Sequence, residues 1–360
     1  MIPVFHCYEF LFLRKLDNDP EFWLKVKTNV LKDNDFSLKS VPNTLWFVAV
    51  TISETKDRFP SFIKKTVLTN PFYAPSPADC ILTRYLQYHD FVEMHLDSIF
   101  KHGENCTLPK ELFRCPNLRI LSLKYNFLEE VPPDIGKFQK LEYLALTNNR
   151  LQNSSIPYTL AFCKKLKVLY LDYNLLDALP GFLLVMPSLK TVHRHGNHNY
   201  FKATFMWYHT DVNERILAIP GSGSSQSKLR SLKLLSASAI IAAKLNFFVD
   251  TCVPSLLKDY ICSIYYDFKI CYKCFTANPR SKAGYKVYTF KNPYLGNFCV
   301  PFQHWACSLE CAEAIEIPAR EEQLLAAMEQ DREYHKHIQE AHRPPFEHKS
   351  LVDNFNCSIL

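Results

Sequence analysis

Four cysteines in the C-terminal third of this 360-residue chain have the spacing of metal ligands. They form two close pairs, Cys271-x-x-Cys274 and Cys307-x-x-x-Cys311, with 32 residues between the pairs. A tetrahedral structural zinc site uses two such pairs, whose thiolates bind the ion and so add folding energy to a small segment. The spacing predicts a structural zinc module, in which Cys299 or His304 could replace one ligand. Reduced, partly buried thiols are the alternative.

No other group of residues predicts bond chemistry. The chain has only 8 glycines and lacks both GxGxxG and GxxxxGK[ST], so a phosphate-binding loop is not expected. It also lacks a nucleophile elbow and a metal-hydrolase helix, and we therefore expect no enzyme. The formal charge of +6 is not concentrated in a stripe, which is a poor indication of nucleic-acid binding.

The N-terminus does not resemble a signal peptide, because it lacks a basic region and His6 and Glu9 interrupt its apolar run. The longest uncharged apolar stretch, residues 45–52, is too short to span a bilayer. We therefore expect a soluble cytoplasmic protein whose 13 cysteines are thiols or metal ligands. The final residues, Cys357-Ser-Ile-Leu360, fit a prenylation pattern, so contact with a membrane is expected only if Cys357 is prenylated.

The middle of the chain contains an internal repeat with steps of 23, 25 and 23 residues. Units that begin at Leu118, Leu141 and Leu166 share the pattern Leu-x-x-Leu-x-Leu-x-x-Asn-x-Leu, and a weaker fourth begins at Leu189. The pattern is identified as the leucine-rich repeat, in which strand leucines point inward and asparagines stack as a ladder. Residues 92–117 would hold a degenerate first unit. Since one unit cannot bury its own face, we expect a short α/β solenoid in the shape of a horseshoe.

The strand positions between the inward leucines are expected to form a concave face. The candidate partner-binding residues on this face are Arg119, Lys124, Glu142, Thr147, Tyr170, Asp172, His193 and His195. Tyr170 and Tyr173, beside mixed charges, suit a protein partner because aromatic side chains anchor interfaces. The alternative is a solvated face that no partner uses.

A different module follows residues 219–227, whose Gly and Ser content is typical of a linker. Leucines then recur at helical spacing beside small residues, and such a helix can pack into a partner's groove. The residues that carry a resemblance to the elongin-binding box are Ser231, Leu232, Leu235, Ser236 and Ile240. An ordinary amphipathic helix would also match this loose pattern.

About a dozen residues later, a second segment resembles the cullin-contacting half of a SOCS (suppressor of cytokine signalling) box. The matching residues are Val253, Pro254, Leu257 and Tyr260. The usual second proline is missing, so the resemblance does not identify the cullin. The alternative is a pair of helices that cap the end of the repeat stack.

The order of repeats, box and cysteine-rich tail is similar to the family of leucine-rich repeat-containing protein 58, over about residues 118–311. The expected parts are an N-terminal aromatic-rich segment of unknown role (1–91), leucine-rich repeats (92–200), a connecting segment (201–228), SOCS-box-like helices (229–268), a cysteine-rich module (269–316) and a C-terminal helix and tail (317–360). Helices are expected from Pro20 to Lys32 and from Ala319 to His342.

The resemblance implies a substrate receptor of an elongin–cullin–RING ubiquitin ligase. The concave face would bind an unidentified protein target, and the first helix of the box would dock on elongin B/C with Leu232 as its main anchor. The alternative is an intracellular scaffold in signalling without a ligase, and a zinc enzyme ranks last. Exposure of Leu232 and Leu235 favours docking, whereas their burial against the repeats favours the scaffold.

Overall fold

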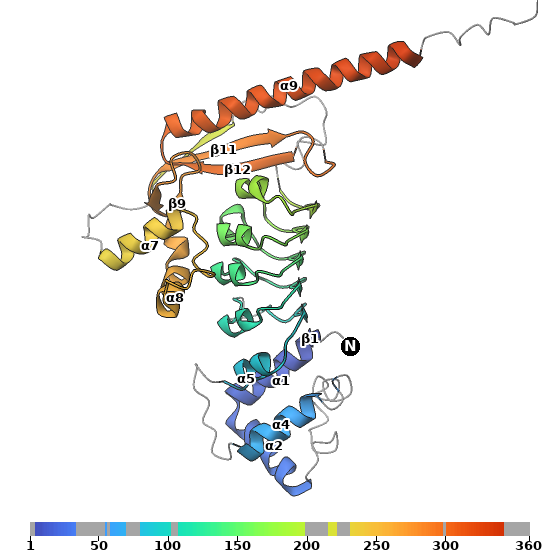
Figure 1. The fold of residues 1–360 in the computed structure, drawn as a ribbon, viewed down its shortest axis with the longest axis vertical. Helices are drawn as coiled ribbons and strands as arrows, with labels where there is room; N and C mark the ends of the chain where they lie inside the picture. Colours follow the sequence, from blue (N-terminus) through green and yellow to red (C-terminus); the bar gives the residue numbers. More distant parts are fainter. Residues whose placement is uncertain are drawn as a thin grey trace, which may run out of the picture.

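The computed structural model describes residues 4–33, 55, 58–69, 80–101, 107–198, 215–221, 231–297 and 300–341. Cys299, Cys357 and residues 222–227 of the expected linker lie outside these residues. Within the described ranges, no helix is both long and apolar enough to cross a membrane. The molecule is elongated, with helices at its N-terminal end, the repeats in the middle and a sheet with a long helix at the other end (Figure 1).

The repeats form the predicted parallel sheet. Its strands from the repeats are β2 (Glu93–His95), β3 (Ile120–Ser122), β4 (Tyr143–Ala145), β5 (Val168–Tyr170) and β7 (Thr191–His193), hydrogen-bonded in that order. The expected degenerate first unit is confirmed by β2. The leucines of the repeat pattern are buried in one continuous core, which explains why neighbouring units must stack.

Short 3-10 helices cover the opposite side of the repeats. They are η3 (Lys110–Arg114), η4 (Pro133–Lys137), η5 (Asn153–Ser155), η6 (Tyr158–Phe162) and η7 (Gly181–Val185). Because 3-10 turns occupy the outer side and strands the inner side, the strand side is the concave face of the stack.

The asparagine ladder is confirmed. The buried Asn126 side chain donates to the carbonyls of Leu96 and Leu123 and accepts from the amides of Ile99 and Phe100. Asn149, Asn174 and Asn197 make equivalent contacts in the following units. Each asparagine thus satisfies backbone groups that the turn would otherwise bury without partners.

The described residues of the N-terminal segment continue the repeat sheet. Strand β1 (Val4–His6) pairs in parallel with β2, and the helices described after it are α1 (Cys7–Asn18), α2 (Pro20–Asp33), α4 (Arg58–Thr69) and α5 (Ile81–Tyr88). The predicted start of the helix at Pro20 is confirmed, and the Asp19 carboxylate accepts the amide of Phe22 there. This segment covers the first repeat, and its apolar side chains belong to the same core.

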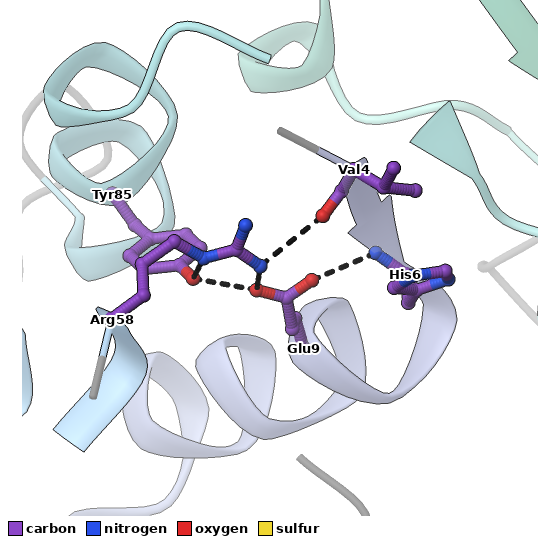
Figure 2. Close-up of polar contacts among 5 residues, drawn as sticks. All are labelled: Val4, His6, Glu9, Arg58 and Tyr85. Atoms are coloured by element: carbon purple, nitrogen blue, oxygen red, sulfur yellow. Dashed lines mark hydrogen bonds and ion pairs between the residues drawn. The ribbon is translucent and has the colours of Figure 1, made fainter. Parts of the chain in front are cut away.

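A buried ion pair fastens these N-terminal elements together (Figure 2). The fully buried Glu9 carboxylate lies 2.6 Å from the Arg58 guanidinium, accepts the Tyr85 hydroxyl at 2.5 Å and accepts the amide of His6 at 2.9 Å. Arg58 also donates to the carbonyl oxygen of Val4 at 3.1 Å. Burial raises the pKa of Glu9, but these donors oppose the shift. The cluster joins α1, α4, α5 and β1.

A four-stranded sheet covers the other end of the repeats. Its order is β6 (Leu179–Pro180), β12 (Val300–Ala306), β11 (Gly284–Lys291) and β8 (Ile216–Ile219). Strand β6 belongs to a repeat, so the sheet is attached to the stack through backbone hydrogen bonds. Gly181 allows this approach, because a Cβ atom there would lie 2.1 Å from Nδ1 of His304.

The expected C-terminal helix begins earlier than predicted. Helix α9 (Leu309–Ala341) includes Pro318, so the predicted start at Ala319 and the predicted boundary at residue 317 are wrong. Ala312 and Ile315 are buried with Val287 of β11, and this packing favours the helical turn before the proline despite the lost hydrogen bond. The helix runs along the sheet and then extends past it (Figure 1).

The segment predicted to resemble a SOCS box forms the helices α7 (Leu232–Ala242) and α8 (Ser255–Ser263). They are followed by η8 (Tyr265–Asp267) and the hairpin strands β9 (Phe268–Ile270) and β10 (Ala277–Pro279). They pack beside the repeats against η4 and η6, where Phe162 meets Phe247. The sheet that contains β12 covers the end of the stack. The alternative in which α7 and α8 cap that end is therefore wrong.

Candidate functional site

Helix α7 has one packed face and one exposed face. Ala237, Ser238 and Ile241 are buried, and the first and last of these lie in the small core beside the repeats. Leu232 is 83% exposed and Leu235 is 44% exposed. Of the other predicted docking residues, Ser231 and Ser236 are also exposed and Ile240 is half-buried.

The local sequence explains how this helix begins. The Ser231 hydroxyl accepts the amide of Leu234 at 3.2 Å, which makes Ser231 the N-cap and places Leu232 at the first helical position. Exposure of a leucine to water at the start of a helix is unfavourable in free energy for the free protein. The arrangement leaves an apolar side chain exposed at the start of α7.

Helix α8 is less available than the sequence indicates. Val253, Leu257 and Tyr260 of the predicted cullin-type box pack partly against the core shared with α7, and Pro254 remains exposed. The Nζ atom of Lys233 lies 3.9 Å from the Tyr260 ring centroid and so joins the two helices. The most exposed apolar side chain of α8 is that of Leu256, at 83%, which was not among the predicted residues.

The structure brings all four predicted metal ligands together. The Sγ atoms of Cys271, Cys274, Cys307 and Cys311 all lie within 4.8 Å of one another. The Cys307 Sγ atom lies 3.5 Å from that of Cys274 and 3.9 Å from that of Cys311. A tetrahedron with Zn–S bonds of 2.3 Å has S–S edges of about 3.8 Å. The cluster thus has the number, type and separation of ligands that zinc requires.

Local backbone geometry places the two pairs. Cys271 and Cys274 lie on the turn between β9 and β10, and Phe275 completes that turn in the left-handed conformation, with φ 57°. Cys307 follows β12, and Cys311 lies in the first turn of α9. The Thr276 hydroxyl, 3.1 Å from Cys274 Sγ, is the main one of several hydrogen-bond partners that lower the pKa of this thiol to about 6. A lowered pKa favours the thiolate, the form that binds metal.

His304 is not one of the clustered ligands. Its Nε2 atom lies 2.9 Å from the Thr289 hydroxyl, and its ring lies 4.2 Å from the ring of Tyr272. Burial and the charge of Lys244 lower its pKa to about 4. His304 therefore packs the sheet against the repeats as a neutral side chain. The other alternative ligand, Cys299, lies outside the described residues.

Lys244 connects α7 to the cysteine cluster. It follows the C-cap of α7 in the left-handed conformation, and its Nζ atom lies among three rings, 4.3 Å from the centroid of Phe275, 5.0 Å from Tyr158 and 5.4 Å from Tyr272. Phe275 and Tyr272 belong to the cysteine turn, and Tyr158 belongs to η6. Burial lowers the pKa of Lys244, and the Cys271 thiol opposes the shift. The end of α7 is thus held between the repeats and the cluster.

The concave face carries a series of contacting rings. Tyr143, Tyr170 and His193 come from three adjacent strands, with centroid distances of 5.2 Å and 4.1 Å between neighbours. The sequence analysis named Tyr170 and His193 but missed Tyr143. The register of the strands indicates its position. Tyr143 lies opposite Val168, which is two residues before Tyr170 and therefore on the same face of β5.

The other predicted concave residues divide into exposed and structural ones. Arg119 is exposed, as are Lys167 and Lys190 at neighbouring strand starts. The Glu142 carboxylate lies 2.5 Å from Lys167 and 3.8 Å from Arg119. Lys124 and Thr147 are half-buried and His195 is exposed. Asp172 was predicted to contact a partner, but it is buried and accepts the His195 amide at 2.7 Å. Its carboxylate therefore stabilises the turn of the next repeat.

Comparison with known proteins supports the repeat assignment. Residues 116–176 match the family model described as leucine rich repeat, and the chain is a leucine-rich repeat protein in this central region. No curated protein matches the chain.

Among solved structures, the LRR ectodomain of the receptor kinase SOBIR1 from Arabidopsis thaliana is 20% identical, with a TM-score of 0.26 over 34% of this chain and 61% of that chain. The Leptospira interrogans LRR protein LIC12759 is 25% identical, with a TM-score of 0.27 over 32% of this chain and 34% of that one. An internalin from Listeria monocytogenes is 16% identical, with a TM-score of 0.26 over 33% and 38%. The chain thus spans less than two thirds of each of these proteins.

Proposed function

We propose that this protein is a cytoplasmic, non-catalytic substrate receptor of an elongin–cullin–RING ubiquitin ligase. In this role the concave face binds a protein target, α7 docks on elongin B/C, and the exposed side of α8 faces a cullin. Catalysis takes place in the recruited transfer enzyme, and this chain contributes proximity. The coarser role, a protein-interaction module built on leucine-rich repeats, agrees with the family match.

The exposure of Leu232 is the observation that carries the proposal. A leucine that is 83% exposed on a capped helix, with the opposite helix face buried, supports docking rather than internal packing. The resemblance of residues 231–240 to an elongin-binding box gives this surface its partner. Burying such a leucine in a partner contributes about 2 kcal/mol, and replacing it with arginine places a charge in the pocket.

The test is binding of purified elongin B/C to the full chain, measured by calorimetry and by co-purification. We expect wild type to bind and Leu232→Arg to lose binding. Leu324→Arg is the matched control, because Leu324 is a 58% exposed leucine on α9, away from α7. Equal binding by both variants would show that α7 is not the docking helix.

The second candidate is a scaffold that holds a signalling partner without a ligase. The half-burial of Val253, Leu257 and Tyr260 against the core shared with α7 favours it, because these residues then serve packing. Absence of elongin binding by wild type, with a folded chain, would select the scaffold.

We further propose that the ion for the cysteine cluster is structural zinc. Four thiols within 4.8 Å of one another, one of them with a lowered pKa, suit this ion. Because four protein ligands fill a tetrahedral coordination sphere, no position remains for a catalytic water. Metal analysis of purified protein tests this: one zinc per chain is expected, and Cys274→Ser should lose it.

A further inference from the structure

The concave face has an uneven distribution of charge around its rings. The strands β3, β4, β5 and β7 and the residues that flank them carry five cations, Arg119, Lys124, Lys167, Lys190 and Arg194, and two carboxylates, Glu142 and Asp172. Both carboxylates are already engaged, Glu142 by two of the cations and Asp172 by a backbone amide. In the described part of the chain, no ion pair joins Lys124 or Lys190 to a carboxylate.

Lys124, the first of these two lysines, lies beside a ring. The Nζ atom of Lys124 is 5.9 Å from the Tyr170 ring centroid, and Lys190 directly precedes strand β7, which carries His193. The Tyr170 and His193 rings stack at an interplanar angle of 6°. Because parallel rings 4.1 Å apart cover each other's faces, the concave face offers the edges of these rings, with the positive charge of Lys124 beside them. Rings bind side chains at low entropic cost, and edge cations steer an oppositely charged partner.

We propose that the concave face of β3, β4, β5 and β7 binds an extended acidic segment of a protein partner, with one aromatic side chain of that segment packed against the rings of Tyr143, Tyr170 and His193. The proposal deepens the target-binding role given to this face and rests on that part of the proposed function. It does not depend on the contact with elongin.

The same chemistry could attract a single-stranded nucleic acid, which also uses rings and cations. The charge pattern favours the protein segment. A phosphate backbone requires a continuous basic track, whereas Glu142 lies between Arg119 and Lys167, and Glu93 lies on the neighbouring strand β2.

The experiment measures fluorescence anisotropy of labelled probes on titration with the full chain. The probes are a glutamate-rich peptide with one central tyrosine, the same peptide with alanine in place of tyrosine, the lysine-rich counterpart and oligo-dT. We expect binding of the first peptide, weaker binding without its tyrosine and none of the lysine-rich peptide. The variant Lys124→Glu/Lys190→Glu should weaken binding at least tenfold, Tyr170→Ala should remove the preference for tyrosine, and Lys336→Glu on α9 is the matched control.

Failure of the acidic peptide to bind, or equal binding by wild type and the double lysine variant, would overturn the proposal. Binding of oligo-dT as tight as that of the peptide would also overturn it, in favour of a nucleic-acid face. Elongin B/C binding is measured on the same preparations, and thermal melting shows whether each variant folds. Lost peptide binding with intact elongin binding overturns only this inference, and the reverse result overturns only the docking role of α7.

Discussion

The two ends of the repeat stack are completed in different ways. At the N-terminal end, β1 extends the sheet, and the described helices α1, α2, α4 and α5 share one core with the repeats. At the other end, Val300 and Phe302 of β12 join that core, but the cysteine turn and the first turns of α9 pack in a separate core with five buried residues in the described part of the chain. A continuous core stabilises its elements by packing, but a small separate core needs a further source of folding energy. We therefore expect a metal to supply, in the cysteine module, folding energy that hydrophobic burial supplies in the larger core.

Removal of the metal tests this difference most strongly. A structural zinc site contributes on the order of 10 kcal/mol to a small domain, so a chelator should unfold the cysteine module and leave the repeats folded. Hydrogen exchange measured by mass spectrometry should show lost protection in β9, β10 and β12 and retained protection in β3 to β5.

Substitutions give the same test without a chelator. Cys271→Ser should reproduce the loss of protection, while Cys252→Ser, which changes an exposed cysteine outside the cluster, should not. Retained protection throughout the module after complete metal removal would contradict the comparison.

The N-terminal end should respond instead to loss of its buried ion pair. Arg58→Ala leaves the fully buried Glu9 carboxylate without its cation, and breaking such a pair costs roughly 3–5 kcal/mol. Urea denaturation followed by hydrogen exchange should show the loss in α1, α4 and α5. Lys167→Ala breaks the exposed pair with Glu142 and should cost less than about 1 kcal/mol. Equal effects of the two variants would show that Glu9 does not depend on Arg58.

Acid should weaken each of the two ends through an imidazole whose pKa is lowered in the fold. The pKa of His304 and that of His89 are both lowered to about 4, chiefly by burial. Because each folded pKa lies below the unfolded value of about 6.5, the stabilisation is present above pH 6.5 and is lost as the pH falls toward 4. For the nearly fully buried His304 the loss amounts to about 3 kcal/mol. His89 is half-exposed, so its loss should be smaller.

Glutamine variants separate these contributions from acid release of the metal. His304→Gln should flatten the pH dependence of unfolding at the C-terminal end between pH 6.5 and 4, and His89→Gln should do so at the N-terminal end. The pH dependence of unfolding of both variants is measured on metal-loaded protein and compared with that of wild type. An unchanged slope in His304→Gln would mean that this imidazole is not neutral in the fold.

Features that depend on a local pattern could be predicted, and features that depend on distant pairing could not. The positions of Asn126, Asn149 and Asn174 follow from the repeat itself, and the four clustered cysteines follow from their spacing. The pairing of Val4 with Glu93 left no local signal, because three residues are too few to show a strand period. Pro318 indicated a helix boundary, but packing of Ile315 carried the helix through it.

The exposure of single side chains was also beyond the sequence. Leu232 and Leu256 have the same exposure, yet only Leu232 belongs to the resembling pattern. Leu257, which does belong to it, turns toward the shared core. A motif gives the residue types of a helix, whereas the neighbouring repeats decide which face remains open.

The smallest expected effect concerns Lys244, where the two kinds of stabilisation meet. Its ammonium group lies among Phe275 and Tyr272 of the cysteine turn and Tyr158 of the repeats. A partly desolvated cation–π contact contributes about 1 kcal/mol, so Lys244→Met should increase hydrogen exchange at the C-terminal end of α7 and weaken elongin binding by up to about fivefold. Lys244→Arg keeps the cation and is the control. If α7 depends on the cysteine module through this residue, chelation of wild type should give the exchange pattern of Lys244→Met. Chelation of the variant should then add no further exchange at α7. Additive effects would mean that the docking helix and the metal module are stabilised independently.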